Sequence, residues 1–142
     1  MSRLTTDLHP KIKVLAEQLL VNANNNGTPI IITQTLRTIE EQNELYNQGR
    51  TKPGKIVTNA KNGDSYHCYG LAFDIALIVG KKVIWNKNDN NHNKIDDWEE
   101  IGKLGEQLGL EWGGRWKFQD IPHFQFTFGL SIADLKAGKT PT

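Results

Sequence analysis

Residues 65–74 read S-Y-H-C-Y-G-L-A-F-D, a segment that places a histidine and an aspartate seven positions apart. His67 ends a polar stretch, whereas Asp74 lies inside an apolar run typical of a buried strand. A carboxylate is costly to bury unless it is paired or bound to a metal. Either Asp74 faces solvent on the same side of the strand as Ala72 and Ala76, or the segment is half of a metal site.

A second histidine and carboxylate lie three positions apart near the C-terminus, in Asp120-Ile-Pro-His123. A lone histidine between a loop and an apolar strand is most often a hydrogen-bonded structural residue. Two histidines and one aspartate, however, are a ligand set that catalytic zinc sites use, with the fourth position left to water. Asp120 then supplies the additional carboxylate that takes a proton from that water.

The composition limits the class of protein. A length of 142 residues with 37% hydrophobic and 23% charged residues predicts a single soluble globular domain over residues 1–142. The net charge of +1 gives no reason to expect a nucleic-acid partner. We expect no membrane insertion, because no apolar run approaches the roughly 20 residues that span a bilayer. The single cysteine, Cys68, excludes an internal disulfide and a cysteine-based zinc site, so any metal must be held by histidines and carboxylates.

The hydrophobic pattern predicts an α+β domain with a small antiparallel sheet and flanking helices. We expect helices at about residues 10–25, 38–49 and 97–108 and from residue 131, and strands at 30–34, 71–79, 82–85, 111–114 and 123–128. A long loop covers residues 50–66, and loops of this length are often functional. Arg37 precedes a helix cap and either pairs at the surface with Glu40 or Glu41 or is a fixed cation that stabilises an oxyanion.

These segments together resemble the peptidoglycan peptidases related to the VanY-type D-alanyl-D-alanine carboxypeptidases, and in particular the L-alanyl-D-glutamate endopeptidases that many phages use as endolysins. The signature S-x-H-x-x-G-x-A-x-D is matched in full by residues 65–74. A second signature, W-G-G followed by D-x-x-H-F, is matched by residues 112–114 and 120–124. The similarity runs from about Ile30 to Gln125, and its combined motifs are far more specific than any single one. One departure is Arg115, where the pattern W-G-G-D-W leads us to expect an aspartate.

The resemblance implies the fold shared by the D,D-carboxypeptidases and the Hedgehog signalling domain. It implies one zinc ion per chain, bound by His67, Asp74 and His123. It also implies that Asp120 is the general base, which activates the attacking water and then protonates the leaving amine.

The resemblance further implies that Arg37 stabilises the tetrahedral intermediate or anchors the substrate. Gln34 and Ser65 are implied to support the site or to bind substrate. We expect Trp116, in the loop beside the proposed base, to contact the substrate. Lys52 and Lys55 in the long loop suit the charged groups of a peptidoglycan stem peptide.

The resulting prediction is a zinc metallopeptidase that hydrolyses the L-Ala–D-Glu bond of peptidoglycan stem peptides, as a phage or prophage endolysin for host lysis. We expect a monomer without a separate cell-wall-binding domain. It is expected to be made in the host cytoplasm without a signal peptide and to act on the cell wall after release. The alternatives are a D,D-carboxypeptidase or dipeptidase of cell-wall peptides and a non-catalytic zinc-bearing binding module.

The polar loop before the third predicted helix has some features of a calcium site. Asp89, Asn91, Asn93 and Glu100 fall at calcium-loop positions one, three, five and twelve. Lys94, however, stands where such a loop requires glycine. We therefore expect a solvated loop and no calcium.

Overall fold

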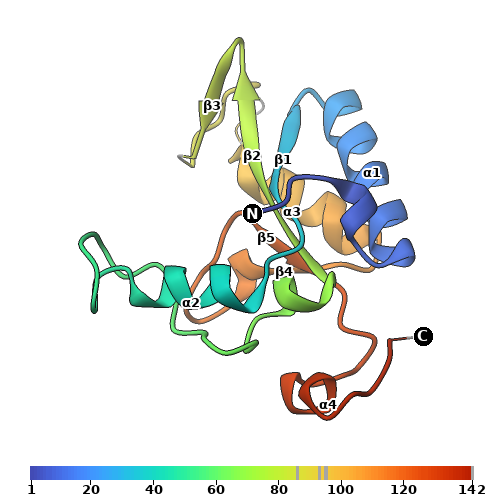
Figure 1. The fold of residues 1–142 in the computed structure, drawn as a ribbon. Helices are drawn as coiled ribbons and strands as arrows, with labels where there is room; N and C mark the ends of the chain where they lie inside the picture. Colours follow the sequence, from blue (N-terminus) through green and yellow to red (C-terminus); the bar gives the residue numbers. More distant parts are fainter. Residues whose placement is uncertain (86, 93, 95, 142) are drawn as a thin grey trace.

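The computed structural model describes residues 1–85, 87–92, 94 and 96–141. Five strands form one antiparallel sheet in the order β1-β2-β5-β4, and β3 pairs with the far end of β2 (Figure 1). The strands are β1 (Ile30–Gln34), β2 (Ala72–Val79), β3 (Lys82–Ile84), β4 (Glu111–Trp112) and β5 (His123–Gln125). The predicted α+β class with a small antiparallel sheet is confirmed.

Four α-helices accompany the sheet, and the predicted helix boundaries agree closely with them. They are α1 (Pro10–Asn25), α2 (Ile39–Asn47), α3 (Asp97–Gln107) and α4 (Ile132–Lys136). Capping boxes open α2 at Thr38 and α4 at Ser131, each satisfying two backbone N–H groups that a helix start leaves free. Figure 1 shows α2 and the loop that follows it beside one end of the sheet, away from α1.

The core lies between one face of the sheet and the pair α1 and α3. Leu71, just before β2, and the alternate residues of β2 up to Leu77 point into this core together with Phe124 of β5. The opposite face of β2 carries Ala72, Asp74 and Ala76. Both alanines are fully buried, so the alternative of a solvated face around Asp74 is wrong.

Two glycines of α3 set the position of the strands that lead to the site. A Cβ atom on Gly102 would lie 2.2 Å from the ring of Trp112, and one on Gly105 would lie 2.4 Å from the ring of Phe124. Only glycine therefore allows the two aromatic rings to press against the helix. This contact fixes the loop between β4 and β5 on the core.

Two predicted strands are shorter in the structure. The strand expected over residues 111–114 ends at Trp112, because the two glycines that follow turn into a short 3-10 helix, Gly113–Arg115. The strand expected over 123–128 ends at Gln125, and Phe128 has a positive φ of 55° that no strand residue adopts. In the part of the chain that the structure describes, no helix is long and apolar enough to cross a membrane.

Candidate metal centre

Three side chains from separate elements meet at one end of the sheet. His67 comes from a 3-10 helix (Tyr66–Tyr69), Asp74 from β2 and His123 from the start of β5. Asp74 Oδ1 lies 3.2 Å from His67 Nε2 and 3.3 Å from His123 Nδ1. One donor atom from each residue lies within 4.8 Å of the others, so this triad can hold a metal ion. Among the described residues it is the only such group.

The backbone around His67 explains how a loop residue is held in this place. The Ser65 hydroxyl accepts a hydrogen bond from the His67 N–H at 3.3 Å and caps the 3-10 helix. Gly70 ends that helix with a φ of 70°, and a Cβ there would lie 3.2 Å from the backbone nitrogen of His9. The signature serine and glycine therefore shape the turn that presents His67.

The charges of the triad are strongly coupled. Burial would raise the pKa of Asp74, but hydrogen bonds from His123 and His67 outweigh it and hold the pKa of this carboxyl well below its usual range. Burial would likewise lower the pKa of His123, and the hydrogen bond with Asp74 outweighs that effect and raises the pKa. The site therefore favours an ionised Asp74.

Arg37 is buried beside the triad. Its Nη1 donates to Gln42 Oε1 at 2.8 Å, its Nη2 donates to Gln34 Oε1, and Nη2 lies 3.8 Å from Asp74 Oδ2. Burial lowers the pKa of the guanidinium. The alternative of a surface arginine paired with Glu40 or Glu41 is wrong.

Gln42 on α2 is the residue that sequence reasoning left without a role. Its side chain is fully buried, and its Nε2 donates to the carbonyl of Ala60 at 2.8 Å while its Oε1 accepts from Arg37. One amide therefore joins the arginine to the long loop. One sequence feature could have identified Gln42: it is a polar residue on the apolar side of the predicted helix, three positions before Leu45.

Asp120 lies at the open side of the centre. Its Oδ2 is 3.8 Å from His123 Nδ1, and 52% of its side-chain surface is exposed. The carboxyl is nevertheless partly withdrawn from water, which raises its pKa above the ordinary value. The Asp120 N–H donates to the Gly113 carbonyl at 2.9 Å, and Trp112 Nε1 donates to the Ile121 carbonyl at 2.7 Å. These bonds fasten the loop to β4.

The remaining predicted site residues lie around the triad. Gln34 pairs with Asp74 across β1 and β2 and contacts Arg37. The Trp116 ring centroid lies 5.2 Å from that of His123, and its Nε1 donates to Glu111 Oε2 at 2.9 Å.

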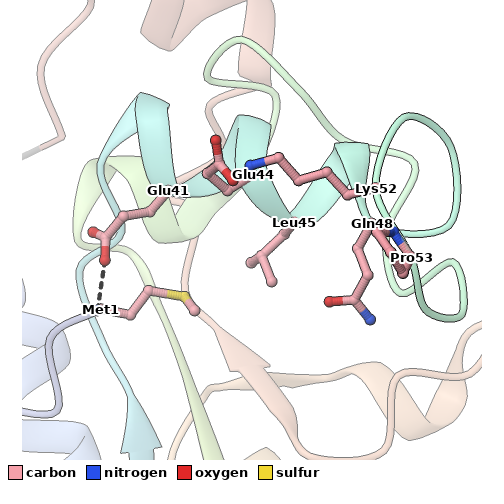
Figure 2. A pocket seen from close by; sticks show the side chains of 7 residues that line it. All are labelled: Met1, Glu41, Glu44, Leu45, Gln48, Lys52 and Pro53. Atoms are coloured by element: carbon pink, nitrogen blue, oxygen red, sulfur yellow. Dashed lines mark hydrogen bonds and ion pairs between the residues drawn. The ribbon is translucent and has the colours of Figure 1, made fainter.

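A pocket of about 240 Å³ borders the triad. Its lining residues are Gln34, Arg37, Leu45, Gln48, Val57, Thr58 and Asp74. A second pocket of about 300 Å³, shown in Figure 2, shares Leu45 and Gln48 with the first and is otherwise lined by Met1, Glu41, Glu44, Lys52 and Pro53. Lys52 forms an ion pair with Glu44 and lines the second pocket but not the first, so its predicted attraction for substrate gains no support from its contacts.

Arg115 has a structural role in place of the expected aspartate. Its guanidinium lies 2.7 Å from Glu99 and 3.0 Å from Glu106 on α3, and 5.0 Å from the Trp112 ring centroid. Hydrogen bonds with Glu106 and Glu99 raise its pKa above the ordinary value. Arg115 thus ties the start of the Asp120 loop to α3.

The loop considered for calcium is only partly described, because Asn93 lies outside the described residues. The Lys94 N–H donates to Asp89 Oδ2 at 2.6 Å, and Asn91 Nδ2 donates to Glu100 Oε2 at 3.1 Å. These carboxylates accept hydrogen bonds from the protein itself.

Comparison with known proteins identifies relatives of this chain. The sequence model of the D-alanyl-D-alanine carboxypeptidase family matches residues 58–126, which include the whole triad. The chain is 49% identical over 123 residues to the peptidoglycan L-alanyl-D-glutamate endopeptidase CwlK of Bacillus subtilis, covering 84% of this chain and 74% of CwlK. It is 33% identical over 117 residues to the L-alanyl-D-glutamate peptidase of Listeria phage A118, covering 82% of this chain and 37% of the phage protein.

Solved structures share the fold. The L-Ala D-Glu endopeptidase ChiX of Serratia marcescens superposes with a TM-score of 0.64 at 23% identity, covering 87% of this chain and 84% of ChiX. The D,D-pentapeptidase VanY of a VanB-type resistance cassette, solved with Zn(II), superposes with a TM-score of 0.61 at 17% identity, covering 84% of this chain and 72% of VanY. The predicted D,D-peptidase-like fold is confirmed, and on its 49% identity to CwlK the chain belongs to the family of peptidoglycan L-alanyl-D-glutamate endopeptidases of the D-alanyl-D-alanine carboxypeptidase type.

Proposed function

We propose that this protein is a zinc peptidase that hydrolyses the L-Ala–D-Glu bond of peptidoglycan stem peptides. The observation that carries the proposal is the triad His67, Asp74 and His123 with Asp120 and Arg37 beside it. The names of two relatives, one from Bacillus subtilis and one from Listeria phage A118, support this bond as the substrate.

The donor set fits zinc. Nitrogen and oxygen ligands bind zinc at about 2.0–2.1 Å, so neighbouring donors in a tetrahedral site lie about 3.3–3.4 Å apart. The distances of 3.2 and 3.3 Å from Asp74 Oδ1 to the two histidine nitrogens match that spacing. Three protein ligands also leave a position for water or substrate, as in catalytic zinc sites. When bound by His67, Asp74 and His123, zinc polarises the scissile carbonyl and lowers the pKa of water.

Asp120 is proposed to be the general base. It lies at the open side of the triad, where an attacking water and a substrate both have access. The carboxylate accepts a proton from the water and donates it to the amine of the leaving D-Glu residue. Its raised pKa suits the first transfer, because a carboxylate with a higher pKa is the stronger base.

Arg37 is proposed to offset the negative charge that develops on the carbonyl oxygen. Gln42 and Gln34 hold its guanidinium in place before substrate arrives, so no reorganisation is needed during the reaction. The pocket bordered by Arg37 has apolar walls at Leu45 and Val57, which suit a small residue such as L-Ala.

The other predicted residues are given supporting roles. Gln34 is proposed to contact substrate from the same pocket, and Trp116 to form the opposite wall against His123. Ser65 is proposed to act on substrate only indirectly, since its hydroxyl is used to hold the turn at His67.

The relatives support a proposal for the biological setting. We propose that the protein acts on the cell wall as a monomeric endolysin of a phage or prophage, and the phage A118 peptidase is the relative that supports this. The bacterial CwlK is the relative that supports a role in a bacterium's own wall turnover.

Mass spectrometry of digested peptidoglycan tests the proposal. The wild-type protein with zinc is expected to release fragments with new N-terminal D-Glu and to leave free L-Ala carboxyl ends, and Asp120→Ala is expected to bind zinc without turnover. Release of terminal D-alanine instead would indicate a D,D-carboxypeptidase. Zinc binding with no cleavage by the wild-type protein would indicate a binding module.

A further inference from the structure

We infer that Glu111 and Gln125 form a hydrogen-bond relay that holds the His123 ring with Nδ1 facing the triad. Gln125 occupies Nε2 of the ring, so Nδ1 is the nitrogen left to bind a metal. The inference rests on the proposed function only in treating His123 as a ligand. Glu111 and Gln125 are therefore assigned as positioning residues.

The relay is a continuous chain of short contacts across β4 and β5. Gln125 Oε1 lies 2.8 Å from His123 Nε2, and Gln125 Nε2 donates to Glu111 Oε2 at 3.1 Å. Glu111 and Gln125 are direct partners in the register of the two strands. Gln125 is only 5% exposed, so water cannot readily replace these bonds.

The chemistry of the three groups fixes the proton. An ionised carboxylate only accepts hydrogen bonds, so Glu111 requires the NH₂ group of Gln125 to point toward it. The carbonyl oxygen of Gln125 must then face His123. Because that oxygen only accepts, Nε2 of His123 must carry a hydrogen, which leaves Nδ1, on the side of Asp74, as the nitrogen that can bind a metal.

The other histidine of the triad is oriented without any side chain. His67 Nδ1 lies 2.9 Å from the backbone carbonyl of Thr35, which only accepts, so Nδ1 carries a hydrogen and Nε2 is the nitrogen that faces Asp74. His67 is therefore fixed by the backbone, whereas His123 depends on a side chain at the exposed position 111. This difference makes the relay testable by substitution.

Glu111 also fixes the aromatic wall of the site. The same oxygen, Oε2, accepts from Trp116 Nε1 at 2.9 Å, and the ring of Trp116 lies against His123. The Glu111 carboxylate thus orients both the candidate metal ligand His123 and the neighbouring ring of Trp116. Partners of metal-bound histidines commonly affect metal affinity about 10–100-fold.

Proton–nitrogen NMR of the zinc-loaded protein tests the relay directly, because the Nε2–H of His123 is then the ring hydrogen that the relay holds. In the wild-type protein, this N–H is expected to exchange slowly with water and to give a resolved signal. In Glu111→Ala and in Gln125→Met, the signal is expected to be lost through faster exchange, whereas Glu40→Ala, which removes an exposed carboxylate from α2, should leave the spectrum unchanged. An unchanged His123 signal in both relay variants would overturn the inference.

Zinc affinity gives a second measure that does not depend on peptidase activity. Competition with a chelating indicator is expected to show about 10-fold weaker zinc binding for Glu111→Ala. The double variant Glu111→Gln/Gln125→Glu exchanges the amide and the carboxylate, keeps an acceptor on His123 Nε2 and should restore binding to within about threefold. Failure of this rescue, with both proteins folded by circular dichroism, would contradict the relay.

The two proposals fail in different ways. If the wild-type protein shows the slowly exchanging Nε2–H and the expected zinc affinity but cleaves no peptidoglycan, the proposed function fails and the relay holds. If peptidoglycan is cleaved and the relay variants bind zinc like the wild-type protein, the relay alone fails.

Discussion

Asp74 on β2 lies directly opposite His123 on β5 in the antiparallel register, so two of the three candidate metal ligands are cross-strand partners. On its other side, Asp74 pairs with Gln34 of β1, which contacts Arg37. The carboxylate therefore occupies the middle of a three-strand segment. Because the opposite face of this segment packs on the core, the geometry of the site is set by the fold and not by a mobile loop.

Replacing Gln42 by leucine tests whether Arg37 is held in advance. Gln42→Leu leaves Arg37 Nη1 and the Ala60 carbonyl without their partner, so we expect a loss of about 1–3 kcal/mol in the free energy of unfolding and a lower kcat. Gln42→Glu keeps an acceptor for Arg37 and should retain more activity than the leucine variant. Denaturant titration and steady-state kinetics measure both effects, and a leucine variant with wild-type kcat would refute the role.

Gly102→Ala tests the contact between α3 and β4. The new Cβ would lie 2.2 Å from the Trp112 ring, so the helix or the ring must move, and we expect a destabilisation of about 1–3 kcal/mol. Lys103→Ala, at the exposed neighbouring position, should change stability by less than about 0.5 kcal/mol. Urea unfolding compares the two. Equal midpoints would mean that the contact does not constrain the Asp120 loop.

The cap of α4 gives a prediction for pH. The backbone N–H of Ser131, with Lys139 and the Ser131 hydroxyl, lowers the pKa of Asp134 below its ordinary value. A lowered pKa in the folded state means that the carboxylate contributes stability above its unfolded pKa of about 3.9 and that this contribution is lost as the pH falls further. Asp134→Asn should therefore be less stable than the wild-type protein at neutral pH, and the difference should shrink in acid. A difference independent of pH would contradict this assignment.

Much of the fold follows from patterns that the sequence displays. The apolar alternation of β2, the capping residues Thr38 and Ser131, and the glycine that ends the 3-10 helix at His67 each have a local physical cause, and the structure agrees with them. The three candidate ligands are also visible as polar residues in or beside apolar strands. Local patterns were sufficient here because each feature depends on neighbours close in the chain.

Other parts of the site depend on contacts between distant segments. Arg37 is buried because Gln42 binds it and because Gln42 in turn binds the long loop. Nothing in the sequence near Arg37 predicts these two contacts. The relay through Glu111 and Gln125 depends on the register of β4 and β5. That register cannot be predicted from the spacing of residues along the sequence. The early end of the strand at Trp112 likewise involves a distant segment, because Gly113, which begins the 3-10 helix, lies against the backbone of Asp120.

Zinc titration of the metal-free protein tests the central claim most directly, because the account depends on one ion held by His67, Asp74 and His123. Calorimetry is expected to show one zinc ion bound per chain, with peptidoglycan cleavage restored in proportion to the zinc added. Asp74→Ala should lose both binding and cleavage, whereas His92→Ala, which removes an exposed histidine outside the triad, should keep both. Unchanged zinc binding by Asp74→Ala, or cleavage by the metal-free protein in the presence of a chelator, would contradict the account.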